Sequence, residues 1–278
     1  MVVLFSEVLG REVEIPDAPK RIVSFSPAAT ETLFKVGLGD SVVGVSAFCA
    51  RPQEARLKRR VGSYSTVSKE LLDEIAPDLI LTVTGYQRDF SVRLSETYPV
   101  YPLELPVSVA GILDFVVKVG LVTGRHDASR ELAGSLMRRL ADVPRMGRLI
   151  TYVEIDLGGP VTFGAHSYIT DAIRLLGCST IFDEERKEWL EPDMQVVAER
   201  NPDAIVYEAK MFSKFGAQDL KRLIGSRGWE NLRAPRNGNC FLTPGPLDFL
   251  AHHGPSFISE AVPWLAENLR DAAARLGL

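Results

Sequence analysis

Short apolar runs alternate with amphipathic segments along most of the chain. Runs short enough to be buried strands lie near Arg21–Phe25, Ser41–Val45, Leu149–Ile155 and Cys240–Thr243. The segments between them carry apolar residues at helical spacing and predict helices. Because strands that alternate with helices form parallel sheets covered on both faces, the pattern predicts an α/β fold.

Two distant segments repeat one pattern. "SKELLDEIAPDLILT" (Ser68 to Thr82) and "DMQVVAERNPDAIVY" (Asp193 to Tyr207) each contain an amphipathic helix, a Pro-Asp turn and a short apolar strand. Asp203 follows Asp78 by 125 positions, which is the size of one lobe. The repeat therefore predicts two Rossmann-like α/β lobes of similar construction.

A long helix is predicted between the two repeats. "DASRELAGSLMRRLADVP" (Asp127 to Pro144) has apolar residues at four-residue spacing, with Asp127 as N-cap and Pro144 beyond the end. Sixteen helical residues span about 24 Å, enough to run from one lobe to the other and to limit hinge motion. We therefore predict an N-terminal lobe over 1–125, a bridging helix over 126–144 and a C-terminal lobe over 145–278.

The stretch "RIVSFSPAATETLFKVG" predicts where a ligand binds. Ser26 follows the strand, Pro27 suits the first helical position, and good helix formers come next, so Ser26 is a candidate N-cap. In parallel sheets, ligands bind where the carboxyl end of a strand meets a helix N-terminus. The loop "DLGGPVTFGAHSY", before a helix near Ile169–Leu176, is the counterpart in the second lobe. The alternative is that Ser26 only caps a helix.

Composition narrows the class of protein. A net charge of −4 gives no broad footprint for nucleic acid, and the basic run "ARLKRR" reads as a solvated loop. Cys49, Cys178 and Cys240 are too far apart for a zinc site or a disulfide framework and are expected to be buried. No apolar run is long enough to cross a bilayer, and the N-terminal segment lacks the features of an export signal. Hydrolase, phosphate-loop, dinucleotide and zinc-protease motifs are all missing, so the sequence favours binding over catalysis.

Several stretches together resemble the metal-chelate (class III) solute-binding proteins of ABC importers, the receptors for cobalamin, ferric siderophores and haem. They are "GREVEIPDAPKRIVSFSPAATETLFKVGLGDSVVGVS", "VGSYSTVSKELLDEIAPDLILT", "LLGCSTIF", "RNPDAIV" and "GWENLRAPRNGNCFLTPG". The resemblance implies two lobes joined by a long helix, with the ligand in the cleft between them. It also implies a monomeric extracytoplasmic protein, periplasmic or membrane-anchored, that has no intrinsic cofactor and delivers its chelate to a membrane permease.

The resemblance also implies roles for single residues. Tyr64 matches an aromatic position that contacts the ligand in cobalamin-binding members, and Trp189 falls near a second one. These aromatic positions, and the lack of an arginine cluster, put cobalamin first among the ligands, ferric siderophore next and haem third. Exposed acidic residues that meet permease arginines match Glu70 in the first lobe and Gln195 in the second. Gln195 is neutral and departs from the pattern, although Asp193 or Glu199 could substitute for it.

Other candidates concern metal and anion binding. His252 or His253, in "FLAHHGPSF", could be an axial ligand to iron or cobalt, and His166 could meet it from the second-lobe loop. Adjacent histidines on a strand point in opposite directions and are a poor bidentate pair. Haem-binding members use a tyrosine ligand, for which the candidates are Tyr64, Tyr86 and Tyr168, and Arg88 could neutralise ligand carboxylates.

Each of these residues also has an ordinary structural interpretation. An isolated aromatic ring usually packs, a lone histidine usually forms a loop hydrogen bond, and a single arginine is usually solvated. The alternative function is a cytoplasmic corrinoid- or metal-handling protein, or an enzyme, of the same fold.

Overall fold

The chain divides into two compact units, each assembled from several stretches of sequence. The computed structural model describes every residue from Met1 to Leu278. Unit 1 contains residues 1–106, 112–138 and 253–255. Unit 2 contains residues 107–111, 139–252 and 256–278.

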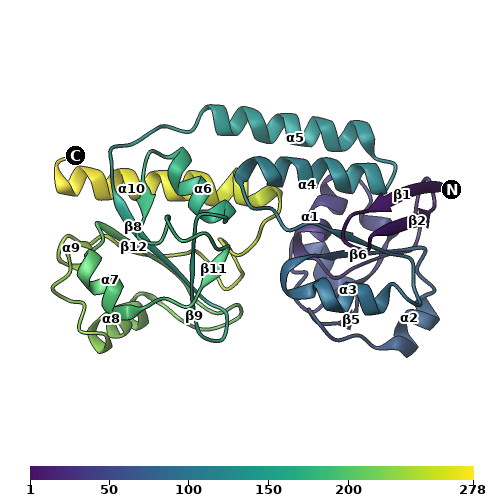
Figure 1. Ribbon diagram of the computed structural model, residues 1–278, viewed down its shortest axis with the longest axis horizontal. Helices are drawn as coiled ribbons and strands as arrows, with labels where there is room; N and C mark the ends of the chain where they lie inside the picture. Colours follow the sequence, from purple (N-terminus) through teal and green to yellow (C-terminus); the bar gives the residue numbers. More distant parts are fainter. The chain divides into compact units, whose positions relative to one another are not determined.

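Unit 1 is built on a five-stranded sheet in the order β5-β4-β3-β6-β7, in which every pair is parallel (Figure 1). Its strands are β3 (Ile22–Ser24), β4 (Val42–Ser46), β5 (Arg59–Gly62), β6 (Leu79–Val83) and β7 (Val100–Leu103). A separate antiparallel hairpin is formed by β1 (Val2–Ser6) and β2 (Arg11–Ile15). The helices within residues 1–106 of unit 1 are α1 (Pro27–Lys35), α2 (Lys69–Ile75) and α3 (Arg88–Leu94), with short turns η1 (Gly39–Ser41), η2 (Gln53–Leu57) and η3 (Gly85–Gln87).

Helices cover both faces of this sheet because its central strands β3 and β6 are buried at every position. Ile22, Leu79 and Leu81 pack on one face with Leu33 of α1 and Phe115 of the later helix α4 (Val109–Val122). The alternate strand residues Val23 and Ile80 face the opposite side of the sheet. There they pack with Leu72 and Ile75 of α2 and with Phe90 and Leu94 of α3. This alternation gives unit 1 three layers and is typical of a buried parallel sheet.

Unit 2 has a mixed sheet in the order β11-β9-β8-β12-β13, and β10 also pairs with β8. Its strands are β8 (Ile150–Asp156), β9 (Pro160–Phe163), β10 (Ser179–Thr180), β11 (Trp189–Leu190), β12 (Ala204–Glu208) and β13 (Cys240–Leu242). β10, β8, β12 and β13 are parallel, whereas β9 is antiparallel to both β8 and β11. The predicted parallel sheet is therefore confirmed for its centre and is extended by an antiparallel edge.

Helices again lie on both faces of the unit 2 sheet (Figure 1). The helices after residue 144 are α6 (Tyr168–Leu175), α7 (Met194–Arg200), α8 (Ala217–Ser226), α9 (Arg233–Arg236) and α10 (Val262–Leu276), with the π-helical turn η4 (Phe257–Ala261) before α10. On one face, Tyr152 and Tyr207 pack with Leu220 and Ile224 of α8 and with Trp229. The α/β fold class is therefore confirmed in both units.

The two repeated segments fold into the same local structure. Ala76 caps the carboxyl end of α2 and Asn201 caps that of α7, and both residues have a left-handed backbone, with φ of 49° and 45°. In each copy a Pro-Asp pair follows and leads into a five-residue strand, β6 or β12. The residue equivalences keep the offset that the sequence predicted.

The repeated aspartates have the same structural task. Asp78 accepts hydrogen bonds from the backbone N–H groups of Lys20 and Arg21, just before β3, at 2.8 and 2.9 Å. Asp203 accepts one from the N–H of Ile150, the first residue of β8, at 2.9 Å. Each carboxylate therefore fixes the start of the neighbouring strand, which the turn reading alone did not predict.

The predicted long helix forms as α5 (His126–Ala141). It begins at His126, so Asp127 lies in its first turn instead of capping it, and it ends at Ala141, before the predicted end at 144. Its role as the connection between lobes stays a prediction. None of the helices in the structure has the length and apolar character needed to span a membrane.

The three cysteines are free thiols. Cys49 and Cys178 are buried, as expected, while Cys240 is half-buried.

Candidate functional site

Ser26 and Pro27 lie where the sequence placed them, between the carboxyl end of β3 and α1. Ser26 caps the helix, since its Oγ accepts a hydrogen bond from the Ala29 N–H at 3.2 Å, and Pro27 is the first helical residue. Ser26 is fully buried beside Ser24 and Thr30, and the Thr30 hydroxyl donates to the Ser26 carbonyl at 3.0 Å. Its role as a cap is confirmed, and its contact with a ligand stays a prediction.

Three further predicted residues of unit 1 follow the carboxyl ends of neighbouring strands. Tyr64 is in the loop after β5, and its ring stacks on Phe48 with centroids 4.4 Å apart. Tyr86 is in η3, after β6, and 82% of it is exposed. Arg88 is the first residue of α3 and is also exposed. Parallel strands end at one edge of their sheet, so these loops share an edge with Ser26.

The predicted residues of unit 2 differ in their surroundings. His166 is exposed and its backbone N–H donates to the Lys187 carbonyl at 3.1 Å. Tyr168 is buried at the start of α6, and its hydroxyl donates to the Leu250 carbonyl at 2.9 Å. Trp189 lies on the edge strand β11 and is 58% exposed. Of these three, Trp189 presents the most apolar surface to solvent.

The two adjacent histidines are both buried. His252 Nδ1 lies 3.7 Å from Asp248 Oδ2 in unit 2. His253 belongs to unit 1, where its ring packs edge-on against Phe115 with centroids 5.5 Å apart. The structure contains no cluster of three or more His, Cys, Asp and Glu side chains arranged to hold a metal ion.

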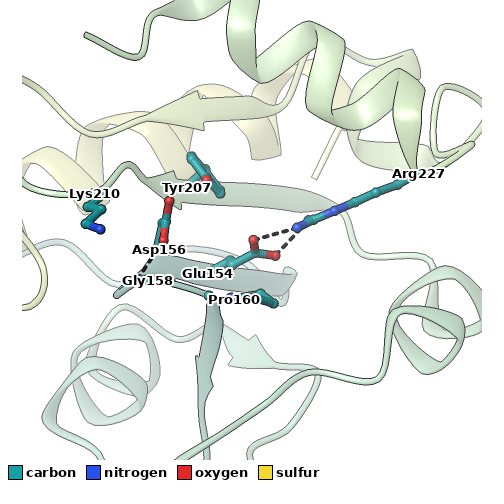
Figure 2. A pocket seen from close by; sticks show the side chains of 8 residues that line it. Glu154, Asp156, Gly158, Pro160, Tyr207, Lys210 and Arg227 are labelled. Carbon is teal, nitrogen blue, oxygen red and sulfur yellow. Dashed lines mark hydrogen bonds and ion pairs between the residues drawn. The ribbon is translucent and has the colours of Figure 1, made fainter. Parts of the chain in front are cut away.

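A polar hollow of about 390 Å³ lies in unit 2, at the carboxyl ends of β8 and β12 (Figure 2). This volume is at the lower end of the range of about 300–1,000 Å³ for ligand pockets. Carboxylate, phenol, ammonium and guanidinium groups line it, together with a glycine turn. The lining residues are Glu154, Asp156, Gly158, Gly159, Pro160, Tyr207, Lys210 and Arg227.

An ion pair lies at one end of the hollow (Figure 2). Arg227, just after α8, donates through Nη1 and Nη2 to the two oxygens of Glu154, both at 2.7 Å. The Glu154 side chain is 2% exposed and that of Arg227 is 17% exposed. Glu154 also accepts a hydrogen bond from the Tyr152 hydroxyl at 2.5 Å. Burial acts to lower the pKa of Arg227, but the hydrogen bonds and charge of Glu154 outweigh it and raise that pKa.

The other end of the hollow carries groups that can meet a ligand. Lys210 is exposed at this end, opposite Arg227 in Figure 2. Asp156 accepts a hydrogen bond from the Gly158 N–H at 2.8 Å, which shapes the turn between β8 and β9. Burial, with the nearby charges of Asp156 and Glu154, raises the pKa of Tyr207 to about 12, so its hydroxyl stays protonated. The hollow therefore offers an ammonium and a phenol as donors and a carboxylate as an acceptor.

These lining residues were not among the predicted site residues, although part of the signal was present. The predicted ligand loop of the second lobe, "DLGGPVTFGAHSY", contributes Asp156, Gly158, Gly159 and Pro160 to the lining, although none of them was named as a site residue. The acidic residues in "YVEID" alternate with apolar ones, as expected for one face of a strand. The pairing of Glu154 with Arg227 joins positions 73 residues apart and has no local signature.

The predicted docking residues begin the two repeated helices. Glu70 is in the first turn of α2. The pKa of its carboxyl is lowered by a hydrogen bond from its own backbone N–H and by one from the Ser68 hydroxyl, so it is charged at neutral pH. Gln195 is at the same point of α7 and donates through Nε2 to Glu199 at 2.8 Å. The Glu199 carboxylate, which could replace the missing acidic residue of unit 2, is thus one helical turn after Gln195.

In both units the central strands are parallel and polar loops follow their carboxyl ends, as is typical of α/β proteins that bind a ligand at this edge. A family model described as periplasmic binding protein matches residues 22–247, so the chain belongs to the periplasmic binding protein family. The class III resemblance seen in the sequence is thereby confirmed.

Individual relatives are distant but extensive in coverage. The chain is 24% identical over 280 residues to the ABC transporter substrate-binding lipoprotein YvrC of Bacillus subtilis (strain 168), covering 96% of this chain and 85% of that one. It is 25% identical over 195 residues to the vitamin B12-binding protein of Yersinia pestis (strain Pestoides F), covering 68% and 69%.

Solved structures show the same fold. The periplasmic heme-binding protein RhuT from Roseiflexus sp. RS-1 superposes with a TM-score of 0.74 at 20% identity, covering 91% of this chain and 99% of that one. The periplasmic vitamin B12 binding protein BtuF of Vibrio cholerae gives a TM-score of 0.70 at 20% identity, covering 91% and 98%.

Proposed function

We propose that this chain is the extracytoplasmic solute-binding component of an ABC importer and that it carries a metal chelate. Cobalamin is the first candidate, ferric siderophore the second and haem the third. Membership of the periplasmic binding protein family supports the binding role, and the names of the relatives supply the ligand classes. The relative named as a substrate-binding lipoprotein supports a place outside the cytoplasm and a permease as partner.

The observation that carries the ligand class is the exposure of aromatic rings beside polar groups in both units. Tyr86 and Trp189 are 82% and 58% exposed, although burial of such rings is strongly favourable. Tyr64 adds a ring stacked on Phe48 in unit 1, and Tyr207 adds a phenol in the hollow of unit 2. Flat rings of this kind cover the apolar faces of a macrocycle or a catecholate, while the polar groups meet its rim.

The test is an equilibrium titration of the purified protein with cyanocobalamin, haemin and ferric siderophores, followed by tryptophan fluorescence and by the visible spectrum after gel filtration. We expect one chelate to co-elute with the protein in a saturable manner. Absence of binding to every chelate would overturn the proposed function.

Tyr64 provides a sharper test of the ligand contact. Tyr64→Ala should weaken the affinity for the bound chelate about fivefold, the equivalent of one lost stacking contact of about 1 kcal/mol. Tyr64→Phe is the matched control, because it keeps the ring that stacks on Phe48 and removes only the hydroxyl. Equal affinities of wild type and Tyr64→Ala would remove Tyr64 from the site.

A further inference from the structure

Phe212 occupies a backbone position that favours glycine. Residues Lys210 to Ser213 form a tight turn, closed by a hydrogen bond from the Ser213 N–H to the Lys210 carbonyl at 2.9 Å. Phe212 has φ of 65°, whereas Met211 is not among the residues with positive φ. This combination defines a type II turn with Phe212 at its third position, where glycine avoids the steric clash of a side chain. Phenylalanine at this point is energetically unfavourable.

The Phe212 ring does not hold the loop in place. It is 53% exposed, so more than half of its surface makes no contact with the protein. The loop is anchored instead by its backbone, through a hydrogen bond from the Phe212 N–H to the Pro246 carbonyl at 2.6 Å. Its far end is anchored by Phe215, whose ring packs on Tyr207 with centroids 5.0 Å apart. Glycine at position 212 would keep each of these contacts and remove the strain.

The turn begins at a residue that lines the polar hollow. It follows the carboxyl end of β12, and its first residue, Lys210, lines the hollow with Asp156 and Tyr207 (Figure 2). An exposed aromatic ring and an ammonium therefore lie two positions apart on one loop at a ligand-accessible edge. Strained backbone conformations cluster at sites that contact a ligand.

We propose that Phe212 and Lys210 form a rim of the ligand site that takes a flat conjugated macrocycle with carboxamide or carboxylate oxygens at its edge. The ring covers part of the apolar face, and the Lys210 ammonium donates hydrogen bonds to the edge oxygens. This inference rests on the proposed function and narrows its ligand to planar macrocycles. A ferric hydroxamate, which has no extended flat face, would gain little from the ring.

The test compares wild type with Phe212→Gly and Phe212→Ala in titrations with cyanocobalamin and haemin, with a ferric trihydroxamate as the non-planar probe. For whichever macrocycle the wild type binds, both variants should raise the Kd about three- to tenfold. The melting temperature of ligand-free Phe212→Gly should rise, because the turn is relieved of strain. A residue that only supports the fold would lower stability and affinity together. Phe5→Ala is the matched control, since Phe5 is 55% exposed on the β1–β2 hairpin, and its Kd should equal that of wild type.

The outcomes separate this inference from the proposed function. Macrocycle affinities within twofold of wild type in both Phe212 variants would overturn the rim and leave the chelate-binding function intact. Binding of the hydroxamate alone would also overturn the rim, while supporting the chelate-binding function. Failure of the wild type to bind any of the three probes would overturn the proposed function, and the rim with it.

Discussion

Removal of the Arg227 guanidinium should destabilise the protein far more than removal of a similar group at the surface. In Arg227→Met, Glu154 would lose both 2.7 Å hydrogen bonds and keep only the one from Tyr152. Because the Glu154 side chain is 2% exposed, its charge would be left poorly solvated. Breaking a buried pair in this way costs about 3–5 kcal/mol of unfolding free energy.

A matched control is available in unit 1. Arg59 donates to both oxygens of Glu74 at 2.8 and 2.6 Å, so the geometry is equally bidentate. These side chains are 43% and 63% exposed, and such pairs contribute about 0.2–1 kcal/mol. Arg59→Met should therefore change stability by no more than about 1 kcal/mol.

Urea unfolding measures both variants. Trp229, whose ring lies 4.8 Å from the Arg227 guanidinium carbon, reports unfolding of unit 2 by fluorescence, while circular dichroism follows the whole chain. Equal losses in the two variants would refute the argument that burial makes the Glu154 pair important. Adding Glu154→Gln to Arg227→Met should recover part of the loss, because it removes the unpaired buried charge.

Two further predictions concern other carboxylates. Burial raises the pKa of Glu208 to about 7 from an ordinary 4.5. Between pH 4.5 and 7, Glu208 therefore holds a proton in the folded protein that it releases in the unfolded chain. The unfolding free energy should therefore fall by about 3 kcal/mol as the pH rises from 4.5 to 7. Urea unfolding midpoints at pH 5 and pH 7 measure this dependence, and Glu208→Gln should lose it. The same pH dependence in Glu208→Gln as in wild type would contradict the prediction. Glu70→Lys should preserve ligand affinity but reduce transport through the permease, because it reverses a charge predicted to meet arginines. Glu14→Lys, at an exposed hairpin position, is the control, and transport by Glu70→Lys equal to that of the control would exclude docking at Glu70.

The fold was predictable where short-range chemistry decides it. The Ser26 cap, the Pro-Asp turns and the buried strands follow from local spacing, because each depends on residues a few positions apart. The strand β9 was missed, because it has only four residues and follows a glycine-containing turn directly after β8. The sequence therefore predicted a loop where β9 forms an antiparallel edge to the sheet.

The site was less predictable than the fold. Local sequence suggested loops at strand ends, and the structure places Tyr64, Tyr86 and Arg88 there in unit 1. The hollow of unit 2 depends on contacts between distant residues, such as Glu154 with Arg227. The conformation of Phe212 depends on its hydrogen bond to Pro246, which no pattern near residue 212 reveals.

The positions that fix the fold and the positions considered for ligand contact lie at opposite ends of the strands. Asp78 and Asp203 fix the amino ends of β3 and β8, whereas the polar and aromatic side chains considered for ligand contact follow the carboxyl ends of strands. Substitutions in the latter loops can therefore accumulate without disturbing the assembly of either sheet. An architecture of this kind can acquire a new cargo by changing a few loop positions while its folding determinants stay fixed, and laboratory evolution of specificity should begin at those loops.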